Sequence, residues 1–124
     1  MSAERVMSPA YDRDRLIELF GGDPAALAEI EREFLDTARG AHREICETED
    51  PETIARAAHR LKGAAGMIGA VTLGGIADAV ERAAKGRDLP GVRSLDDALA
   101  QEVARVAAQA GADQARGRSI TVAE

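Results

Sequence analysis

The sequence has few aromatic residues and no excess of positive charge, and both shortages narrow the functions open to it. Tryptophan is absent, and Tyr11, Phe20 and Phe34 are the only aromatic residues, so the chain offers no platform on which bases could stack. Asp and Glu outnumber Lys and Arg by 22 to 16, which gives a formal net charge of -6. Because nucleic-acid binding depends on Lys and Arg that neutralise phosphates, we expect no nucleic-acid partner.

Cysteine and long apolar runs are also scarce. Cys46 is the one cysteine, which excludes a disulfide within the chain and a cysteine-based metal cluster. No stretch approaches the roughly 20 apolar residues that span a bilayer. The segment from Met1 to Asp14 lacks the apolar core of a secretory signal. We therefore expect a cytoplasmic protein without a membrane partner.

Residues that favour helices are abundant. Ala, Leu, Glu and Arg are strong helix formers, whereas the β-branched and aromatic residues that favour strands are few. A chain of 124 residues is long enough for one domain with a single modest core. The composition therefore predicts an all-α protein of one domain.

Apolar residues at helical spacing predict five helical segments. The expected segments are 12–20, closed by Gly21-Gly22; a second opened by Asp23-Pro24 that reaches Ile45; a third opened by Asp50-Pro51 that reaches Ile68; a fourth from Leu73 to Ala84; and a last one, after a turn at 86–90, from Val92 to Ala110.

The four longer segments pack most simply as an up-down four-helix bundle, with the short extra N-terminal helix as a lid. We expect a flexible N-terminus over 1–11, the bundle over 12–112 and a disordered tail over 113–124, where the periodicity fades. Since the bundle can bury its own apolar stripes, we expect a monomer.

The third segment places a histidine among glycines. Gly63, Gly66 and Gly69 interrupt a good helical pattern, and each interior glycine costs about 1 kcal/mol relative to alanine. At roughly 100° per residue, His59 falls roughly 150° from the centre of the apolar stripe. Gly63, Gly66 and Ala55 lie on its side of the helix. We therefore expect an exposed imidazole on a surface kept low for a docking partner.

Positive side chains flank this histidine. Lys62 follows His59 by three residues and Arg56 precedes it by three, so both can approach a group on the ring. Arg60 is adjacent but points further round, and it could assist docking. Three cations around one histidine in an acidic protein indicate an anion, and a phosphoryl group is one that nearby cations would stabilise.

Glu81 is the candidate to orient the ring. If the third and fourth segments form an antiparallel hairpin that turns near Ala70, His59 and Glu81 lie eleven residues from the turn on either side. Glu81 could then accept a hydrogen bond from one ring nitrogen and leave the other nitrogen as the nucleophile.

Each of these residues also has an ordinary structural interpretation. Lys62 and Arg56 could be solvated surface charges, and Glu81 could simply pair with Arg82 or Lys85. Met67 could contact a partner or belong to the edge of the core. His42 has no clustered ligands, so we interpret it as structural or merely exposed.

One run of residues resembles a known family. Ala58-His59-Arg60-Leu61-Lys62-Gly63, followed by Gly69-Ala70, Leu73 and Val80-Glu81, is similar to the signature of histidine phosphotransfer (HPt) domains of two-component phosphorelays. The resemblance implies a four-helix bundle in which His59 is phosphorylated on its outward ring nitrogen. It also implies that Lys62 steadies the phosphoryl group, that Gly63 clears room for the partner, and that Glu81 occupies a position often held by Glu or Gln beside the imidazole.

The resemblance further implies a phosphoryl carrier in signal transduction, without ATP-dependent kinase activity of its own. It would exchange the phosphoryl group reversibly with an aspartate of a response-regulator receiver domain, and a hybrid sensor kinase would stand upstream. We expect no cofactor in this chain and magnesium on the partner receiver domain. The residues expected to meet the partner are Ala55, Arg56, Arg60, Gly63, Gly66 and Met67.

Three other classes of protein are alternatives to the phosphoryl carrier. A non-catalytic helical module that only binds a signalling partner stays open as the main alternative. The phosphoacceptor domain of a sensor kinase normally has an acidic residue directly after its histidine, where this chain has Arg60. A hydrolase fits least, because no set of histidine, serine and acid is arranged by the sequence.

Overall fold

The computed structural model describes the backbone of residues 9–123 and the side chains of residues 9–115. The described chain is helical throughout, with no strand in that part. Its helices are α2 (Arg13–Phe20), α3 (Pro24–Glu47), α4 (Pro51–Met67), α5 (Val71–Lys85), α6 (Leu89–Arg93) and α7 (Asp96–Ala123). The expected all-α fold is confirmed.

Aspartate side chains begin most of these helices. The carboxylates of Asp12, Asp23, Asp50 and Asp88 each accept a hydrogen bond from the backbone N–H three residues further on. Such a cap satisfies one of the donors that the first turn leaves unpaired. Proline at the start of α3, α4 and α6 adds a backbone already set to helical φ. These signals fix where α2, α3, α4 and α6 begin.

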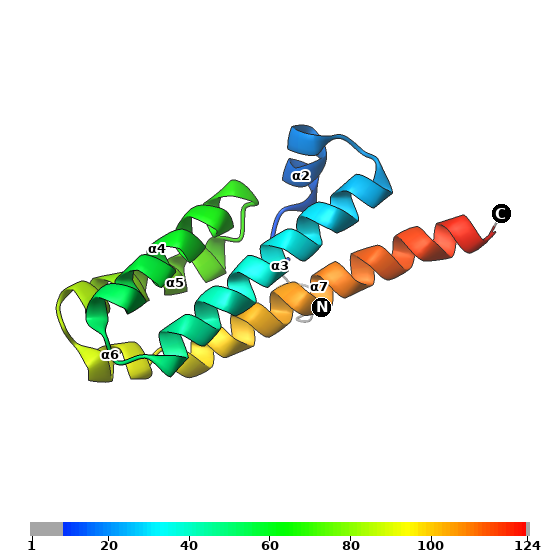
Figure 1. Cartoon of the computed structure of the whole chain (residues 1–124). Coiled ribbons are helices and arrows are strands. Elements are labelled where there is room, and N and C mark those ends of the chain that lie inside the picture. The colour runs from blue at the N-terminus through cyan, green and yellow to red at the C-terminus, as the bar shows by residue number, and fades with distance from the viewer. Residues whose placement is uncertain (1–8, 124) are drawn as a thin grey trace, which may run out of the picture.

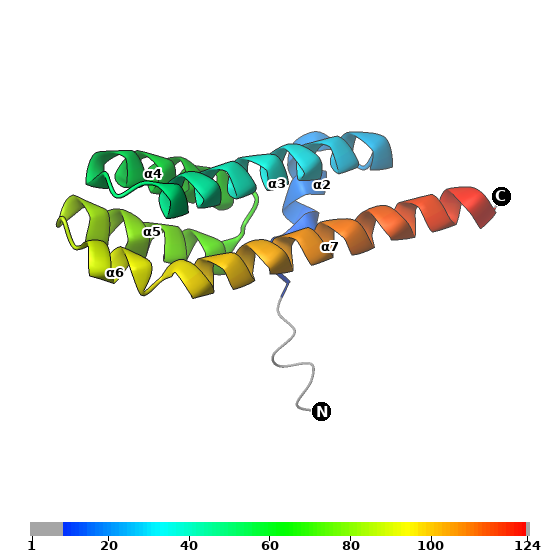
Figure 2. The ribbon, with the colours of Figure 1, turned by 60° about the horizontal axis from the view of Figure 1, so that its bottom comes forward.

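The helices α3, α4, α5 and α7 form the expected four-helix bundle. Figure 2 shows α3 and α4 in one layer and α5 and α7 in the other, and each helix packs against its two neighbours in the ring α3, α4, α5, α7. Their apolar stripes meet in one core whose largest members include Leu27, Ile45, Ile54, Leu61, Leu73 and Leu99. No helix in the described chain is both long and apolar enough to cross a membrane.

A tight turn sets the register between α4 and α5. Gly69 has φ +70°, a left-handed conformation that glycine adopts without strain. A Cβ atom at this position would lie 2.8 Å from Cβ of Asp12, so only glycine lets the start of α2 come this close. The backbone N–H of Asp12 also donates to the carbonyl of Ile68 at 3.0 Å. The turn therefore joins the hairpin to α2 at one end of the bundle.

The last part of the bundle differs from the expected turn and single helix. Residues 89–93 form the separate helix α6, and α7 starts at Asp96, whereas we expected a turn over 86–90 and one helix from Val92. The carboxylate of Asp88 explains the difference, because it accepts a hydrogen bond from the N–H of Gly91 at 2.9 Å. This cap starts a short helix before the chain bends into α7.

Both expected domain boundaries need correction. Residues 1–8 lie outside the described chain, but Ala10 and Tyr11 are buried rather than flexible. Likewise α7 continues beyond Gly111 to Ala123, where we expected a disordered tail, and Asp113 is buried. Figure 1 shows α3 and the C-terminal part of α7 extending together past the α4–α5 hairpin, with α2 against that end of α3.

A buried polar cluster explains why the chain is ordered beyond both boundaries. The hydroxyl of Tyr11 donates to the Glu31 carboxylate at 2.6 Å, and Arg13 lies 3.3 Å from Glu31 and 3.4 Å from Asp113. The side chain of Gln109 accepts from the N–H of Ala10 at 2.7 Å and donates to the carbonyl of Tyr11 at 3.1 Å. Burial raises the pKa of Glu31, and the hydrogen bond from Tyr11 opposes that rise.

We predict that Tyr11→Phe lowers the free energy of unfolding by about 1–3 kcal/mol, because it removes the hydroxyl donor at 2.6 Å from the buried Glu31 carboxylate, which then keeps Arg13 at 3.3 Å. Urea unfolding followed by circular dichroism measures the change. Phe20→Leu, at an exposed position of α2, serves as the control and should change the stability by less than about 0.5 kcal/mol. Equal stability of Tyr11→Phe and wild type would show that the hydroxyl contributes nothing.

Candidate functional site

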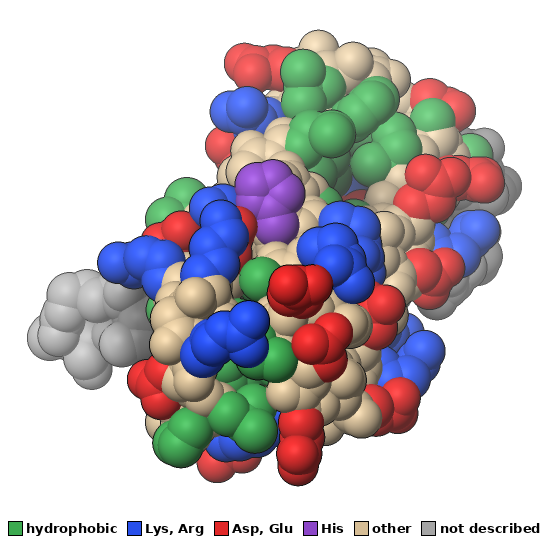
Figure 3. Space-filling model, turned by 60° about the vertical axis from the view of Figure 1, so that its left-hand side comes forward, with side chains coloured by type: hydrophobic (Ala, Val, Ile, Leu, Met, Phe, Trp, Pro, Cys, Tyr) green, Lys and Arg blue, Asp and Glu red, His purple; other side chains and the backbone are tan. Residues whose placement is uncertain are grey.

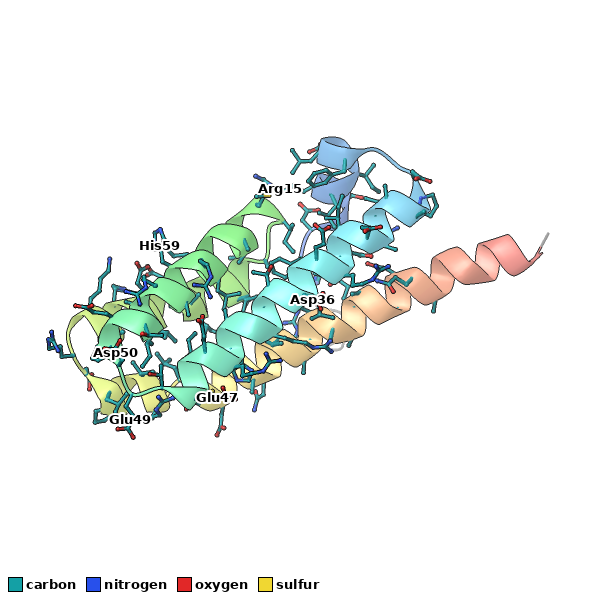
Figure 4. All side chains as sticks on the ribbon, viewed as in Figure 1. Arg15, Asp36, Glu47, Glu49, Asp50 and His59 are labelled. Carbon is teal, nitrogen blue, oxygen red and sulfur yellow. The ribbon has the colours of Figure 1, made fainter. Side chains whose placement is uncertain are left out.

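His59 stands on the outer face of α4, near the middle of the helix. Its side chain is 70% exposed, and Figure 4 shows it pointing away from the bundle. Gly63 and Gly66 are exposed on the same helix, and a Cβ atom added to either would meet nothing within 4 Å. Ala55, one turn before the histidine, is half-buried. The ring therefore rises from a surface with few protruding side chains.

Glu81 holds one side of the ring. Its Oε2 lies 3.0 Å from Nδ1 of His59, so the hairpin brings together two residues that are 22 positions apart. The pKa of Glu81 is lowered to about 2, first by the hydrogen bond from Lys62 and then by those from Lys85 and His59, while burial opposes the shift. An ionised carboxylate only accepts hydrogen bonds. Nδ1 must therefore carry the ring proton in this contact.

The other ring nitrogen is left open by this arrangement. Nε2 of His59 has no hydrogen-bond partner among the residues that the structure describes. With the proton on Nδ1, a neutral ring keeps its lone pair on Nε2. The site thus presents a nucleophilic nitrogen to solvent in a fixed tautomer.

Two lysines share the Glu81 carboxylate with the histidine. Nζ of Lys62 lies 2.8 Å from Oε1, and Nζ of Lys85 lies 3.1 Å from Oε2. Lys62 also donates to Asp78 at 3.1 Å, and Asp78 in turn pairs with Arg82 at 3.0 Å. The hydrogen bonds to Glu81 and Asp78 raise the pKa of Lys62, so this lysine is positively charged at neutral pH.

The remaining cations and the docking candidates lie around the histidine in different ways. Arg56 is exposed, and its guanidinium is 3.5 Å from the hydroxyl of Thr53. Arg60 turns toward α3 and pairs with Glu44. Met67 is 57% exposed at the end of α4, which favours the partner-facing interpretation over the core edge. His42 is half-buried on α3.

The surface view shows how these groups are distributed. In Figure 3 a histidine lies between Lys and Arg side chains, with uncharged surface and then a hydrophobic area beyond it. The exposed large hydrophobic residues of the described chain are Ile17, Leu19, Phe20, Met67 and Val71. They come from α2 and from the two ends of the α4–α5 turn, so charge and apolar surface occupy separate areas.

Sequence reasoning underrated two residues of the site. The sequence offers Lys85 only as an alternative partner of Glu81, yet Glu81 contacts Lys85 and His59 through the same oxygen. Asp78 is not among the residues predicted for the site. The signal for both was helical spacing, because residues three or four apart on α5 share a face with Glu81.

This arrangement is suited to carrying a group. In the part of the chain with described side chains, no group of three or more His, Cys, Asp or Glu could hold a metal ion. What the site does offer is an oriented, exposed nitrogen with cations close by. Those are the features that an attack on an electrophilic phosphorus requires.

We predict that Glu81→Gln lowers the free energy of unfolding at pH 7 by about 1.5–3 kcal/mol, the range for hydrogen bonds to a charged group. Since the folded pKa of Glu81 is about 2, against an ordinary 4.5, the stabilisation is complete above about pH 5 and is lost as the pH falls toward 2. The difference between wild type and variant in urea unfolding should therefore shrink from pH 6 to pH 3. A difference independent of pH would contradict the ionised contact.

The comparisons with known proteins support the same interpretation. Residues 23–109, more than half of the chain, match the family model described as the Hpt domain. The match contains α4 and α5 entirely, and with them His59, Lys62 and Glu81. No curated protein and no solved structure matches the chain. The chain therefore belongs to the Hpt domain family, the phosphocarrier modules of histidine phosphotransfer in two-component systems.

Proposed function

We propose that this chain accepts a phosphoryl group on Nε2 of His59 from an aspartate of a response-regulator receiver domain, and returns it to such an aspartate. One observation carries the proposal. The bond from Nδ1 to Glu81 at 3.0 Å fixes the tautomer on a ring that is 70% exposed. An accessible nitrogen nucleophile that needs no further activation is what a phosphoryl carrier requires.

The transfer step needs no general base, because Nε2 of His59 carries no proton that would have to be removed. The lone pair of Nε2 attacks the phosphorus of the aspartyl phosphate, a P–N bond forms, and the P–O bond to the aspartate breaks. The carboxylate leaves with its electron pair, while the proton on Nδ1 stays in the hydrogen bond to Glu81. The positive charge that the ring gains is balanced by the ionised carboxylate beside it. Glu81 therefore stabilises the phosphorylated ring without taking its proton.

The partner supplies the rest of the chemistry in this proposal. Phosphoryl transfer has a loose, in-line transition state, so positioning and charge stabilisation provide most of the catalysis. The receiver domain would bring magnesium and its acidic pocket, and this chain would bring the nucleophile and Lys62. We also propose that a hybrid sensor kinase stands upstream and that the protein is cytoplasmic. We propose a monomer, since the four apolar stripes are buried within the bundle.

We predict that wild type incubated with a phosphorylated receiver domain gains the mass of one phosphoryl group, and that His59→Gln gains none. The label should survive alkali and be lost in acid, as a phosphoramidate bond is. Intact-mass spectrometry after each treatment measures this. His42→Gln is the matched control, because it removes the other histidine from a half-buried position, and it should be labelled like wild type.

The opposite result points to the binding-only module. If receivers from a broad panel bind the chain but never label it, and binding is unchanged in His59→Gln, the phosphoryl carrier is the wrong interpretation.

The apolar area next to His59 is the proposed docking surface for the receiver domain. The residues that form it are Ile17, Leu19, Phe20, Met67 and Val71, which are 40–80% exposed. Arg15 holds α2 against α4, because its Nε donates to the carbonyl of Met67 at 2.9 Å, and Figure 4 shows Arg15 at that end of α4. Gly63 and Gly66 leave open space between the ring and this area. A partner that contacts both would have His59 at the edge of its interface.

We predict that Met67→Asp weakens receiver binding by about tenfold or more, because the interface would then bury an unpaired charge. The stability of the free protein should hardly change, since Met67 is exposed. Isothermal titration calorimetry with the receiver domain measures the affinity. Ala104→Asp, at an exposed position of α7, is the control and should bind like wild type. Equal losses for both variants would place the docking surface elsewhere.

A further inference from the structure

A shallow hollow opens beside the imidazole. It has a volume of ≈ 300 Å³ and is lined by Ala55, Arg56, His59, Glu81 and Lys85. Two of these residues are cations, and they come from different helices, Arg56 from α4 and Lys85 from α5. Ala55 forms part of the lining between them without a long side chain. The hollow therefore has the size and the charge to take a small anion next to the ring.

The cations near His59 differ in how far they are already neutralised. Lys62 contacts two carboxylates, Glu81 and Asp78, and Arg60 is paired with Glu44. Within the described side chains, Arg56 has no carboxylate within ion-pair distance. Lys85 contacts one carboxylate oxygen, Oε2 of Glu81, which also accepts from His59. Arg56 and Lys85 thus have the largest unbalanced charge, and both line the hollow.

We infer that Lys85, together with Arg56, binds the phosphoryl oxygens when His59 is phosphorylated, and that the hollow between them is where the group lies. The inference rests on the proposed function, because it names further residues of the same site. Lys62, the cation already named in the proposed transfer, keeps its contacts with Glu81 and Asp78, and Lys85 is the lysine that moves from the carboxylate to the phosphoryl group.

The position of Lys85 makes this movement short. Its Nζ and Nδ1 of His59 lie close to the same oxygen of Glu81, at 3.1 and 3.0 Å. The side chain of Lys85 is 67% exposed, so its flexible four-carbon stem can swing around the ring toward Nε2. Glu81 keeps its contacts with Lys62 and His59 when Lys85 moves away, so the buried carboxylate still has two donors.

The test uses chemically phosphorylated protein, so that it does not depend on a receiver domain. Phosphoramidate transfers its phosphoryl group to the imidazole, with release of ammonia. The ³¹P resonance of phosphorylated His59 is then followed against pH in wild type and in Lys85→Met, and its site is checked by its loss in His59→Gln. A cation on the phosphoryl oxygens favours the dianion, so Lys85→Met should raise the titration midpoint by about 0.2–0.7 pH unit.

Three variants make the result specific. Lys85→Arg keeps the charge and should restore the wild-type midpoint. Arg82→Met removes a 75% exposed cation one turn away, whose ion pair is with Asp78, and should leave the midpoint unchanged. Lys85→Met combined with Glu81→Gln, compared with Glu81→Gln alone, should still raise it, because the contact does not pass through the carboxylate.

The outcomes separate this inference from the proposed function. An unchanged midpoint in Lys85→Met, or a change that disappears in the Glu81→Gln background, overturns the direct contact, while transfer from a receiver domain would still support the carrier. If chemically labelled protein never exchanges its phosphoryl group with any receiver domain, the carrier function is contradicted. The contact between Lys85 and the phosphoryl group is then supported by the ³¹P titration midpoint alone. A wild-type chain that takes no label at His59 contradicts both.

Discussion

The buried carboxylate of Glu81 is the group on which the site depends. An ionised side chain that is 4% exposed is costly unless several donors surround it, and here His59, Lys62 and Lys85 all reach it. Those three contacts lower its pKa to about 2, and the two from His59 and Lys62 tie α4 to α5. The same contacts fix the tautomer of His59 and hold two ammonium groups beside the ring. One carboxylate therefore sets the position, the protonation and the charge surroundings of the histidine.

Such a site needs α4 and α5 to stay in a fixed register. The small residues between these two helices hold them in that register. The faces of α4 and α5 that meet in the core contain Ala57, Ala58, Ala65, Ala77 and Ala84, all buried. A Cβ atom on Gly74 would lie 3.6 Å from that of Ala65, so the two backbones approach closely. Short side chains leave little freedom for repacking. Beyond the α4–α5 turn, at the same end of the bundle, the cluster of Tyr11, Glu31 and Asp113 holds α3 and α7 together.

Most of the fold could be predicted from local signals, and the site in part. Asp-Pro pairs and apolar spacing gave the starts of α3 and α4, and counting from the turn at Ala70 brought His59 next to Glu81. Two kinds of feature escaped prediction. Residues 10, 11 and 113 are buried where Tyr11 and Asp113 meet across 102 positions, and no local pattern encodes that contact. The role of Lys85 depends on which carboxylate each cation contacts, and spacing alone left Arg82 and Lys85 equivalent as partners of Glu81.

A carrier must also release what it accepts, and the carboxylate bears on this requirement. If the lysines near His59 had no partner in the free protein, their whole attraction for the phosphoryl group would stabilise the phosphorylated state. That state would then be too stable to pass the group on. Because Glu81 and Asp78 already occupy Lys62, and Glu81 occupies Lys85, an arriving phosphoryl group competes with an existing ion pair. Only the difference between the two contacts stabilises the phosphorylated state. In the proposed carrier, the ion pairs that organise the free site would thus also limit how tightly the phosphoryl group is held, and transfer would stay close to reversible in either direction.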